Sequence, residues 1–173
     1  MAGLTHLGVG MAAKRVIPGV PVWLLVVAAY AIDLVFGVFW AMGLDHLPTG
    51  GAATIAPWSH GLLMSAVWSV AFGLGAWLAS RNRRMGLAIG LLVFSHWVVD
   101  FIAKPMLHAF PGDAGLPLLF DGSPTVGLGL WRTAAGEYIG EYAVTALLAL
   151  VYVFDRLKRR NAAKSLAQEG GLS

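Results

Sequence analysis

The chain contains no cysteine, and it contains few charged residues. The lack of cysteine excludes disulfide bonds, thiolate zinc sites, iron–sulfur clusters and a cysteine nucleophile. Asp, Glu, Lys and Arg make up 12% of the 173 residues, whereas soluble domains carry about a quarter. Hydrophobic residues make up 58%. This length and composition predict a single domain embedded in a membrane.

Ten of the twelve Lys and Arg residues lie in three short clusters beside apolar segments. The excess of positive charge would suit nucleic acid, but this placement is typical of cytoplasmic anchors of a membrane protein. We therefore expect membrane lipids as partners and no nucleic acid. The clusters are Lys14 and Arg15; Arg81, Arg83 and Arg84; and Arg156, Lys158, Arg159, Arg160 and Lys164.

Four segments are long and apolar enough to cross a bilayer, which takes about 20 residues. The basic clusters precede the first segment, separate the second from the third and follow the fourth, so both termini are predicted to be cytoplasmic. The predicted fold is an all-α membrane protein, a four-helix transmembrane bundle over residues 1–164 with a disordered cytoplasmic tail at 165–173. The four spans run from about Pro18 to Leu44, Ser59 to Ser80, Met85 to Lys104 and Glu137 to Phe154.

The connection between the third and fourth spans is long and rich in Pro and Gly. Residues 105–136 hold four prolines and six glycines but also apolar stretches such as LPLLF and GLGLW. Backbone at membrane depth is tolerated only where it is buried in protein or lines a cavity. We therefore expect this extracytoplasmic loop to fold back over the helix ends. The pairs Gly86/Gly90 and Gly136/Gly140 favour close helix approach.

Six ionisable side chains lie inside or at the mouths of the predicted spans, all in the same half of the bilayer. Intramembrane acids and histidines are costly, usually face a bundle interior and mark function. Each helix contributes at least one member at comparable depth, and two imidazoles with several carboxylates suit Zn²⁺ or another divalent transition metal. The six are Asp33, His60, His96, Asp100, Glu137 and Glu141.

Structural alternatives exist for each of these residues taken singly. His60 and His96 can be hydrogen-bonded structural residues, Asp100 can accept from Ser95 or from backbone groups, and Glu141 can pair with Arg132. Two further histidines, His46 and His108, fall in loops and are treated as solvated or secondary. His6 lies near the cytoplasmic terminus and is excluded as a ligand. Asp113 and Asp121 lie in turn-like contexts.

Three motifs resemble a group of small bacterial membrane proteins described as membrane-bound metal-dependent hydrolases, sometimes as permeases. The motifs are PWSHGLLMSAVW, SHWVVDFIAKP, and GLGLW followed by an acidic residue on the last helix, and the resemblance covers about Ala31 to Tyr152. It implies a bacterial inner-membrane location and a metal site using His60, His96 and Asp100, with Asp33 and Glu141 as further members. The chain departs from the pattern of this group in one place. Its members tend to have a His and an Asp close together before a Pro-Leu pair, whereas here His108 and Asp113 lie five positions apart.

The leading functional hypothesis is a metal-dependent hydrolase that acts on a lipid-like ester or phosphoester near the outer leaflet. A divalent ion, zinc by preference, would be held by His60, His96 and Asp100, and Asp33 or Glu141 would act as general base. Ser59 and Ser95 would orient the adjacent histidines. Two alternatives remain: a non-enzymatic accessory subunit of a larger membrane complex, with a protein partner or a second copy, and a small ion or proton permease.

Overall fold

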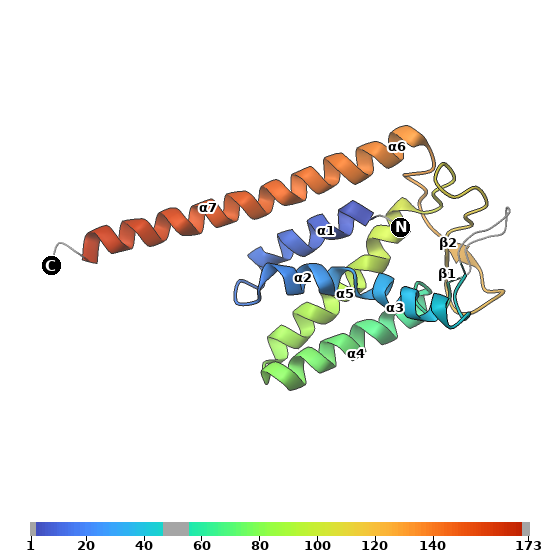
Figure 1. The fold of residues 1–173 in the computed structure, drawn as a ribbon, viewed down its shortest axis with the longest axis horizontal. Coiled ribbons are helices and arrows are strands. Elements are labelled where there is room, and N and C mark those ends of the chain that lie inside the picture. The colour runs from blue at the N-terminus through green and yellow to red at the C-terminus, as the bar shows by residue number, and fades with distance from the viewer. Residues whose placement is uncertain (1–2, 47–55, 171–173) are drawn as a thin grey trace.

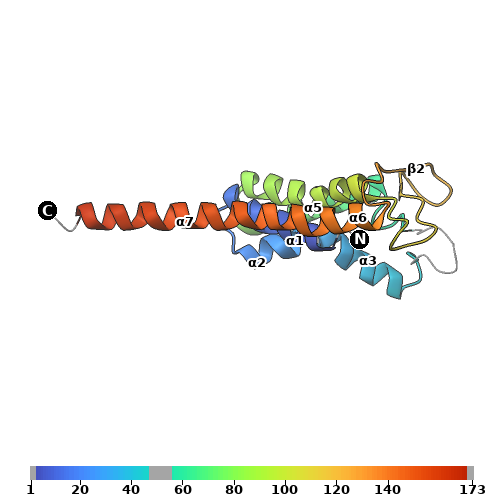
Figure 2. The same cartoon turned by 90° about the horizontal axis from the view of Figure 1, so that it is seen from above.

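The computed structural model describes residues 3–46 and 56–170, and the fold is mostly helical (Figure 1). In both views the C-terminal part of α7 projects beyond the other helices (Figure 2). The elements are α1 (Gly3–Ala12), the 3-10 turn η1 (Ala13–Arg15), α2 (Val22–Ala29), α3 (Ala31–Ala41), α4 (Leu62–Ser80), α5 (Arg83–Ala103), β1 (Leu116–Pro117), β2 (Thr125–Val126), α6 (Ala134–Tyr138), the π-helical turn η2 (Ile139–Val144) and α7 (Thr145–Gly170).

Three helices of the described residues are long and apolar enough to cross a membrane. They are α4, α5 and the continuous helix that α6, η2 and α7 form over residues 134–166. The pair α2 and α3 passes the same test together, although its two halves are bent by 51°. The chain thus has three candidate spans, or four if the bent pair is one span, and this is consistent with a membrane protein.

The first span was predicted as one helix over residues 18–44, and this continuity is wrong. Helix starts only at Val22 and breaks at Tyr30, where ψ is 5°. The carbonyl of Ala29, the last residue of α2, accepts a hydrogen bond from His96 Nδ1 of α5 at 2.9 Å. A side chain that takes a backbone carbonyl out of the helical ladder is a recognised cause of a kink. We therefore attribute the bend between α2 and α3 to the contact of Ala29 with His96 of α5.

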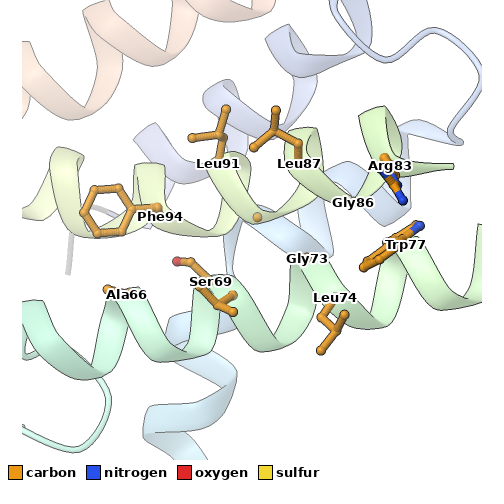
Figure 3. A pocket seen from close by; sticks show the side chains of 12 residues that line it. Ala66, Ser69, Gly73, Leu74, Trp77, Arg83, Gly86, Leu87, Leu91 and Phe94 are labelled. Carbon is orange, nitrogen blue, oxygen red and sulfur yellow. The ribbon is translucent and has the colours of Figure 1, made fainter.

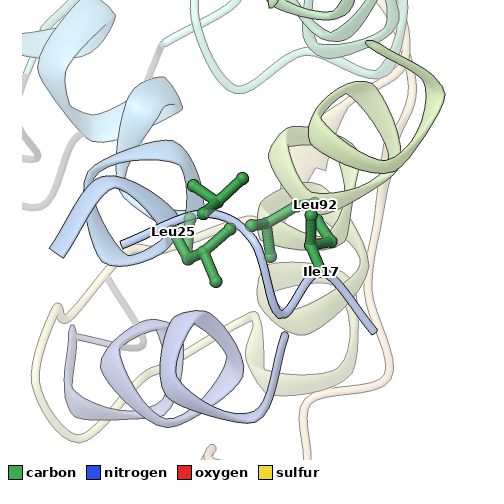
Figure 4. Close-up of a cluster of buried hydrophobic side chains, with 5 residues drawn as sticks. Ile17, Leu25 and Leu92 are labelled. Atoms are coloured by element: carbon green, nitrogen blue, oxygen red, sulfur yellow. The ribbon is translucent and has the colours of Figure 1, made fainter. Parts of the chain in front are cut away.

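Residues 3–12 form α1, a helix that the sequence analysis did not predict. It packs against α2 and α7, beside which it lies in Figure 1. Gly10 permits the close approach, because a Cβ atom there would lie 2.7 Å from Val26 Cα. A buried apolar cluster fastens the turn after α1 to α2 and α5 (Figure 4). Its members are Ile17, Val20, Leu25, Ala29 and Leu92.

The helices α4 and α5 form an antiparallel hairpin whose turn is capped by Asn82. The Asn82 side chain accepts from the backbone N–H groups of Arg84 and Met85, at 3.0 and 3.2 Å. This is the usual way to satisfy the free N–H groups at a helix start. Along the hairpin, a Cβ at Gly73 would lie 2.9 Å from Gly86 O. The two backbones therefore touch beside an apolar groove of about 790 Å³ (Figure 3).

Between α5 and α6 the chain is irregular apart from the short antiparallel ladder of β1 and β2. Its last part runs back along the end of α5: Leu128 N donates to Phe101 O at 2.8 Å, and Leu130 N donates to Ile102 O at 3.1 Å. These bonds satisfy carbonyls that the end of a helix leaves free.

The C-terminal helix is longer than the predicted fourth span. It continues through α7 to Gly170, so residues 165–170 are helical where the sequence predicted a disordered tail. Residues 171–173 of that tail lie outside the described residues.

The contact between α4 and α5 gives a matched test on one helix. Gly73→Ala puts a methyl group against the backbone of α5, and such overpacking typically costs about 1–3 kcal/mol. Gly75, on the same helix, faces open space, since no atom lies within 4 Å of the position that a Cβ would take. Gly75→Ala should therefore keep or raise stability by up to about 1 kcal/mol through helix propensity. Thermal unfolding of both variants in detergent measures this difference. Equal midpoints for the two variants would contradict the close approach.

Candidate metal centre

The centre of the site is a triangle of three side-chain atoms, two from the helices α3 and α5 and one from the turn before α4. His60 Nε2, from the turn before α4, lies 3.3 Å from Asp33 Oδ1 of α3. His96 Nε2 of α5 lies 3.6 Å from the same Asp33 oxygen and 3.4 Å from His60 Nε2. Three residues that are 27 to 63 positions apart in the sequence thus direct one potential ligand atom each at a common point.

Both histidines are oriented by a hydrogen bond on the ring nitrogen that faces away from the triangle. His96 Nδ1 contacts the Ala29 carbonyl, and since a carbonyl only accepts, Nδ1 carries the proton and Nε2 has a free lone pair. His60 Nδ1 lies 2.8 Å from Ser59 Oγ, which can accept its proton in the same way. Histidines that bind metals almost always donate their other N–H to such a partner.

The dimensions of the triangle fit a metal ion. Three atoms separated by 3.3–3.6 Å have a common centre about 2.0 Å from each of them, and zinc binds imidazole nitrogen and carboxylate oxygen at about 2.0–2.2 Å. Asp33 Oδ1 is buried and has no hydrogen-bond partner among the described residues. A cation would supply the positive charge that neutral imidazoles do not offer this oxygen.

Asp100 lies beside the triangle and links it to a further histidine. Its Oδ2 is 3.7 Å from His60 Nε2, and its Oδ1 is 3.4 Å from His6 Nε2. The His6 ring stacks on the His96 ring, with centroids 3.7 Å apart and an angle of 8° between the planes. His6, His96 and Asp100 therefore form a second set of potential ligands within 4.8 Å of one another. One imidazole nitrogen binds one ion, so the two sets cannot both be filled through His96 Nε2.

His6, which the sequence analysis excluded as a ligand, lies inside the cluster. His6 lies on α1, is 1% exposed and sits against His96 and Asp100. The sequence does contain a signal for this position. Residues 2–13 carry no Asp, Glu, Lys or Arg before Lys14, and about twelve residues at 1.5 Å each are long enough to reach halfway into a bilayer. The segment is too short to span a bilayer, so a search for complete spans does not find it.

The site is almost completely enclosed. His96 and Asp100 have no exposed surface, and His60 is 4% exposed. Asp33 is the most accessible member, with 11% of its side chain exposed. What exposed surface the cluster has therefore lies mostly on Asp33 of α3.

The structure brings together four of the six sequence candidates, Asp33, His60, His96 and Asp100. The predicted convergence of His60, His96 and Asp100 is therefore observed, whereas their roles stay predictions. Ser95 does not orient His96, because its hydroxyl donates to Leu92 O at 2.6 Å.

The other two candidates lie elsewhere. Glu141, in η2, accepts from the backbone N–H groups of Leu4 and Thr5 at 2.8 and 3.1 Å. It thereby caps the N-terminus of α1, where negative charge is favourable. Glu137 pairs with His108 at 2.8 Å near the surface. The predicted role of Glu141 as a general base stays a prediction, but its observed contacts are those of a helix cap.

Comparisons with known proteins add no relative to this picture. No family model, no curated protein and no solved structure matches the chain. The resemblance to membrane-bound metal-dependent hydrolases therefore stays a prediction, and the side-chain geometry carries the argument about function.

Proposed function

We propose that this chain is a membrane-embedded metal-dependent hydrolase whose substrate is a lipid-like ester or phosphoester. The observation that carries the proposal is the triangle of His60 Nε2, His96 Nε2 and Asp33 Oδ1, with sides of 3.3–3.6 Å. Two nitrogens and one oxygen at tetrahedral spacing suit Zn²⁺, and three protein ligands leave a position for water or substrate, as catalytic zinc sites do.

The proposed roles differ from the sequence assignment for Asp33, Asp100 and Glu141, and they add His6. Asp33 belongs to the ligand triangle, so the general base is Asp100, which lies between His60 and His6. A divalent ion would polarise a phosphoryl or ester oxygen and acidify a water. Asp100 would accept the proton of that water, and His6, at 3.4 Å, would hold the proton with it. The stacked rings keep His6 in this position.

In the proposed topology, α2 with α3 counts as one bent span, and the turn after α1, the turn between α4 and α5 and the C-terminal part of α7 lie at the cytoplasmic face of a bacterial inner membrane. The start of α1 lies toward the other end of the bundle, where Leu4 and Thr5 donate to Glu141, so the prediction of a cytoplasmic N-terminus does not fit this topology. The basic clusters lie at the ends of the spans predicted to be cytoplasmic. The segment between α5 and α6 is then extracytoplasmic. His60 and Asp100 lie toward that end of the molecule, one before the first turn of α4 and the other in the last turn of α5. The position of His60 and Asp100 near the proposed extracytoplasmic end supports a substrate in the outer leaflet.

A second candidate is a structural metal centre in a non-enzymatic accessory subunit. The observation that favours it is the burial of the cluster, in which only Asp33 exceeds 5% exposure. A structural site closes all positions around its ion. Both candidate functions require a bound metal ion, and only the hydrolase turns over a substrate.

Metal content is the first test, with His96→Ala as the variant and His108→Ala as its control. His96 belongs to both possible ligand sets, whereas His108 is 46% exposed and pairs only with Glu137 among the described residues. Wild type and His108→Ala should retain a divalent ion after purification, and His96→Ala should lose it. Elemental analysis by mass spectrometry measures the ratio of metal to protein. Equal metal in wild type and His96→Ala, or none in wild type, would contradict the site.

The hydroxyl of Ser59 gives a finer test of the ligand geometry. Ser59→Ala removes the partner of His60 Nδ1, and loss of such an outer partner typically lowers metal affinity about 10–100-fold. Ser95→Ala is the matched control, because the Ser95 hydroxyl bonds Leu92 O. Competition with a fluorescent zinc chelator measures both affinities. If the two variants bind zinc equally tightly, His60 does not ligate through Nε2 in the way proposed.

Turnover separates the hydrolase from the structural centre. The full-length protein in zinc-supplemented vesicles of phosphatidylglycerol and phosphatidylethanolamine should release hydrolysis products, detected by lipid mass spectrometry. Asp100→Asn keeps the shape of the side chain but cannot accept the proton, and it should lower the rate by about 10²–10⁴-fold, the usual contribution of a general base. His108→Ala should keep the wild-type rate. Metal-loaded wild type that hydrolyses neither lipid would favour the structural centre.

A further inference from the structure

A second polar site lies at the opposite end of the bundle, between the turn after α1 and the middle of α7. It is a cavity of about 510 Å³. Figure 1 shows α7 running past this turn before it projects beyond the other helices. The lining includes four basic residues, Lys14, Arg156, Arg159 and Arg160, and a single acid, Asp155. The proposed metal centre does not use any of them.

The basic groups are only partly satisfied by the protein. Arg159 Nε pairs with Asp155 at 2.6 Å. Lys14 Nζ donates to the carbonyls of Pro18 and Val20 at 2.7 and 2.6 Å, which leaves the third of its three N–H donors. Arg160 makes no side-chain hydrogen bond or ion pair within the part of the chain that the structure describes. The cavity therefore has a net positive charge and free donors.

The lining also changes from apolar to charged along α7. Tyr152 lies on the side of the predicted span, and Val22, at the start of α2, adds an apolar wall. Exposed apolar side chains, Val153 and Phe154, directly precede Asp155 and Arg156. Aromatic residues followed by basic ones mark the level at which a helix leaves the hydrocarbon. A ligand here would meet cations around its polar part and apolar surface below it.

We propose that this cavity binds the phosphate headgroup of an anionic phospholipid. Guanidinium and ammonium groups are the donors that recognise phosphate oxygens, and basic pockets between membrane helices at the cytoplasmic face bind anionic headgroups. The two parts of the chain that line the cavity, residues 14–22 and 152–163, are at least 130 positions apart in the sequence. The bound lipid holds the turn after α1 against α7. This proposal does not depend on the metal centre.

The test compares two double variants that remove the same charge from the same helix. Arg156→Gln with Arg160→Gln changes the lining of the cavity, whereas Lys158→Gln with Lys164→Gln changes basic residues of α7 outside it. The full-length protein is placed in nanodiscs of phosphatidylcholine and phosphatidylglycerol, and retained lipid is counted by native mass spectrometry. Wild type and the Lys158/Lys164 variant should retain one phosphatidylglycerol, and the Arg156/Arg160 variant should bind it about thirtyfold more weakly.

Three results would overturn the proposal. In the first, wild type binds phosphatidylglycerol no better than phosphatidylcholine. In the second, the two double variants lose bound phosphatidylglycerol equally. In the third, the Arg156/Arg160 variant retains phosphatidylglycerol as wild type does. A parallel titration with inorganic phosphate separates the two sources of the same chemistry. If phosphate alone displaces the lipid or raises the thermal midpoint as much as phosphatidylglycerol does, the ligand is a soluble anion and not a lipid. Equal midpoints of all three proteins in phosphatidylcholine alone show that the variants are folded.

Discussion

The hydrogen bond from His96 Nδ1 to the carbonyl of Ala29 is the interaction on which the site depends. It takes this carbonyl out of the helical ladder at the bend between α2 and α3 and satisfies it, and an unsatisfied carbonyl inside a membrane costs several kcal/mol. The same bond fixes the proton on Nδ1 and directs Nε2 at Asp33, which lies four residues beyond Ala29 on the other side of the bend. One contact therefore explains the kink, the tautomer and the position of the carboxylate.

The enclosure of the cluster restricts the states it can adopt. Asp33 faces two imidazoles, and the His6 ring stacks directly on the His96 ring. Protonating both stacked rings would place two positive charges about 4 Å apart in a medium of low dielectric constant, which is costly. The divalent cation of the proposed function would instead supply positive charge to the carboxylate from the centre of the triangle.

The sequence predicted what depends on residue type and regular spacing. His96 and Asp100 share a helix face, and the places of α4 and α5 followed from apolar length and the basic turn between them. Two features of the structure could not be predicted from the sequence, the bend at Tyr30 and the role of Glu141. The bend at Tyr30 has no Pro or Gly at that residue, because its cause is a side chain of another helix. The role of Glu141 as a cap also depends on a partner about 136 positions away, whereas the local sequence suggested only Arg132.

The position of His6 shows why a short segment is the hardest to place. A ten-residue helix is marginal on its own, since isolated helices shorter than about 12–15 residues gain too little to offset nucleation. Its location is therefore decided by tertiary contacts, which it makes with α2 and α7 along its length and at its two ends. Glu141 holds the first turn through the N–H groups of Leu4 and Thr5, and Lys14 closes the turn that follows α1 by binding the carbonyls of Pro18 and Val20. Both contacts come from outside the helix itself. The third histidine of the cluster is thus placed by the tertiary fold and not by the helix that carries it.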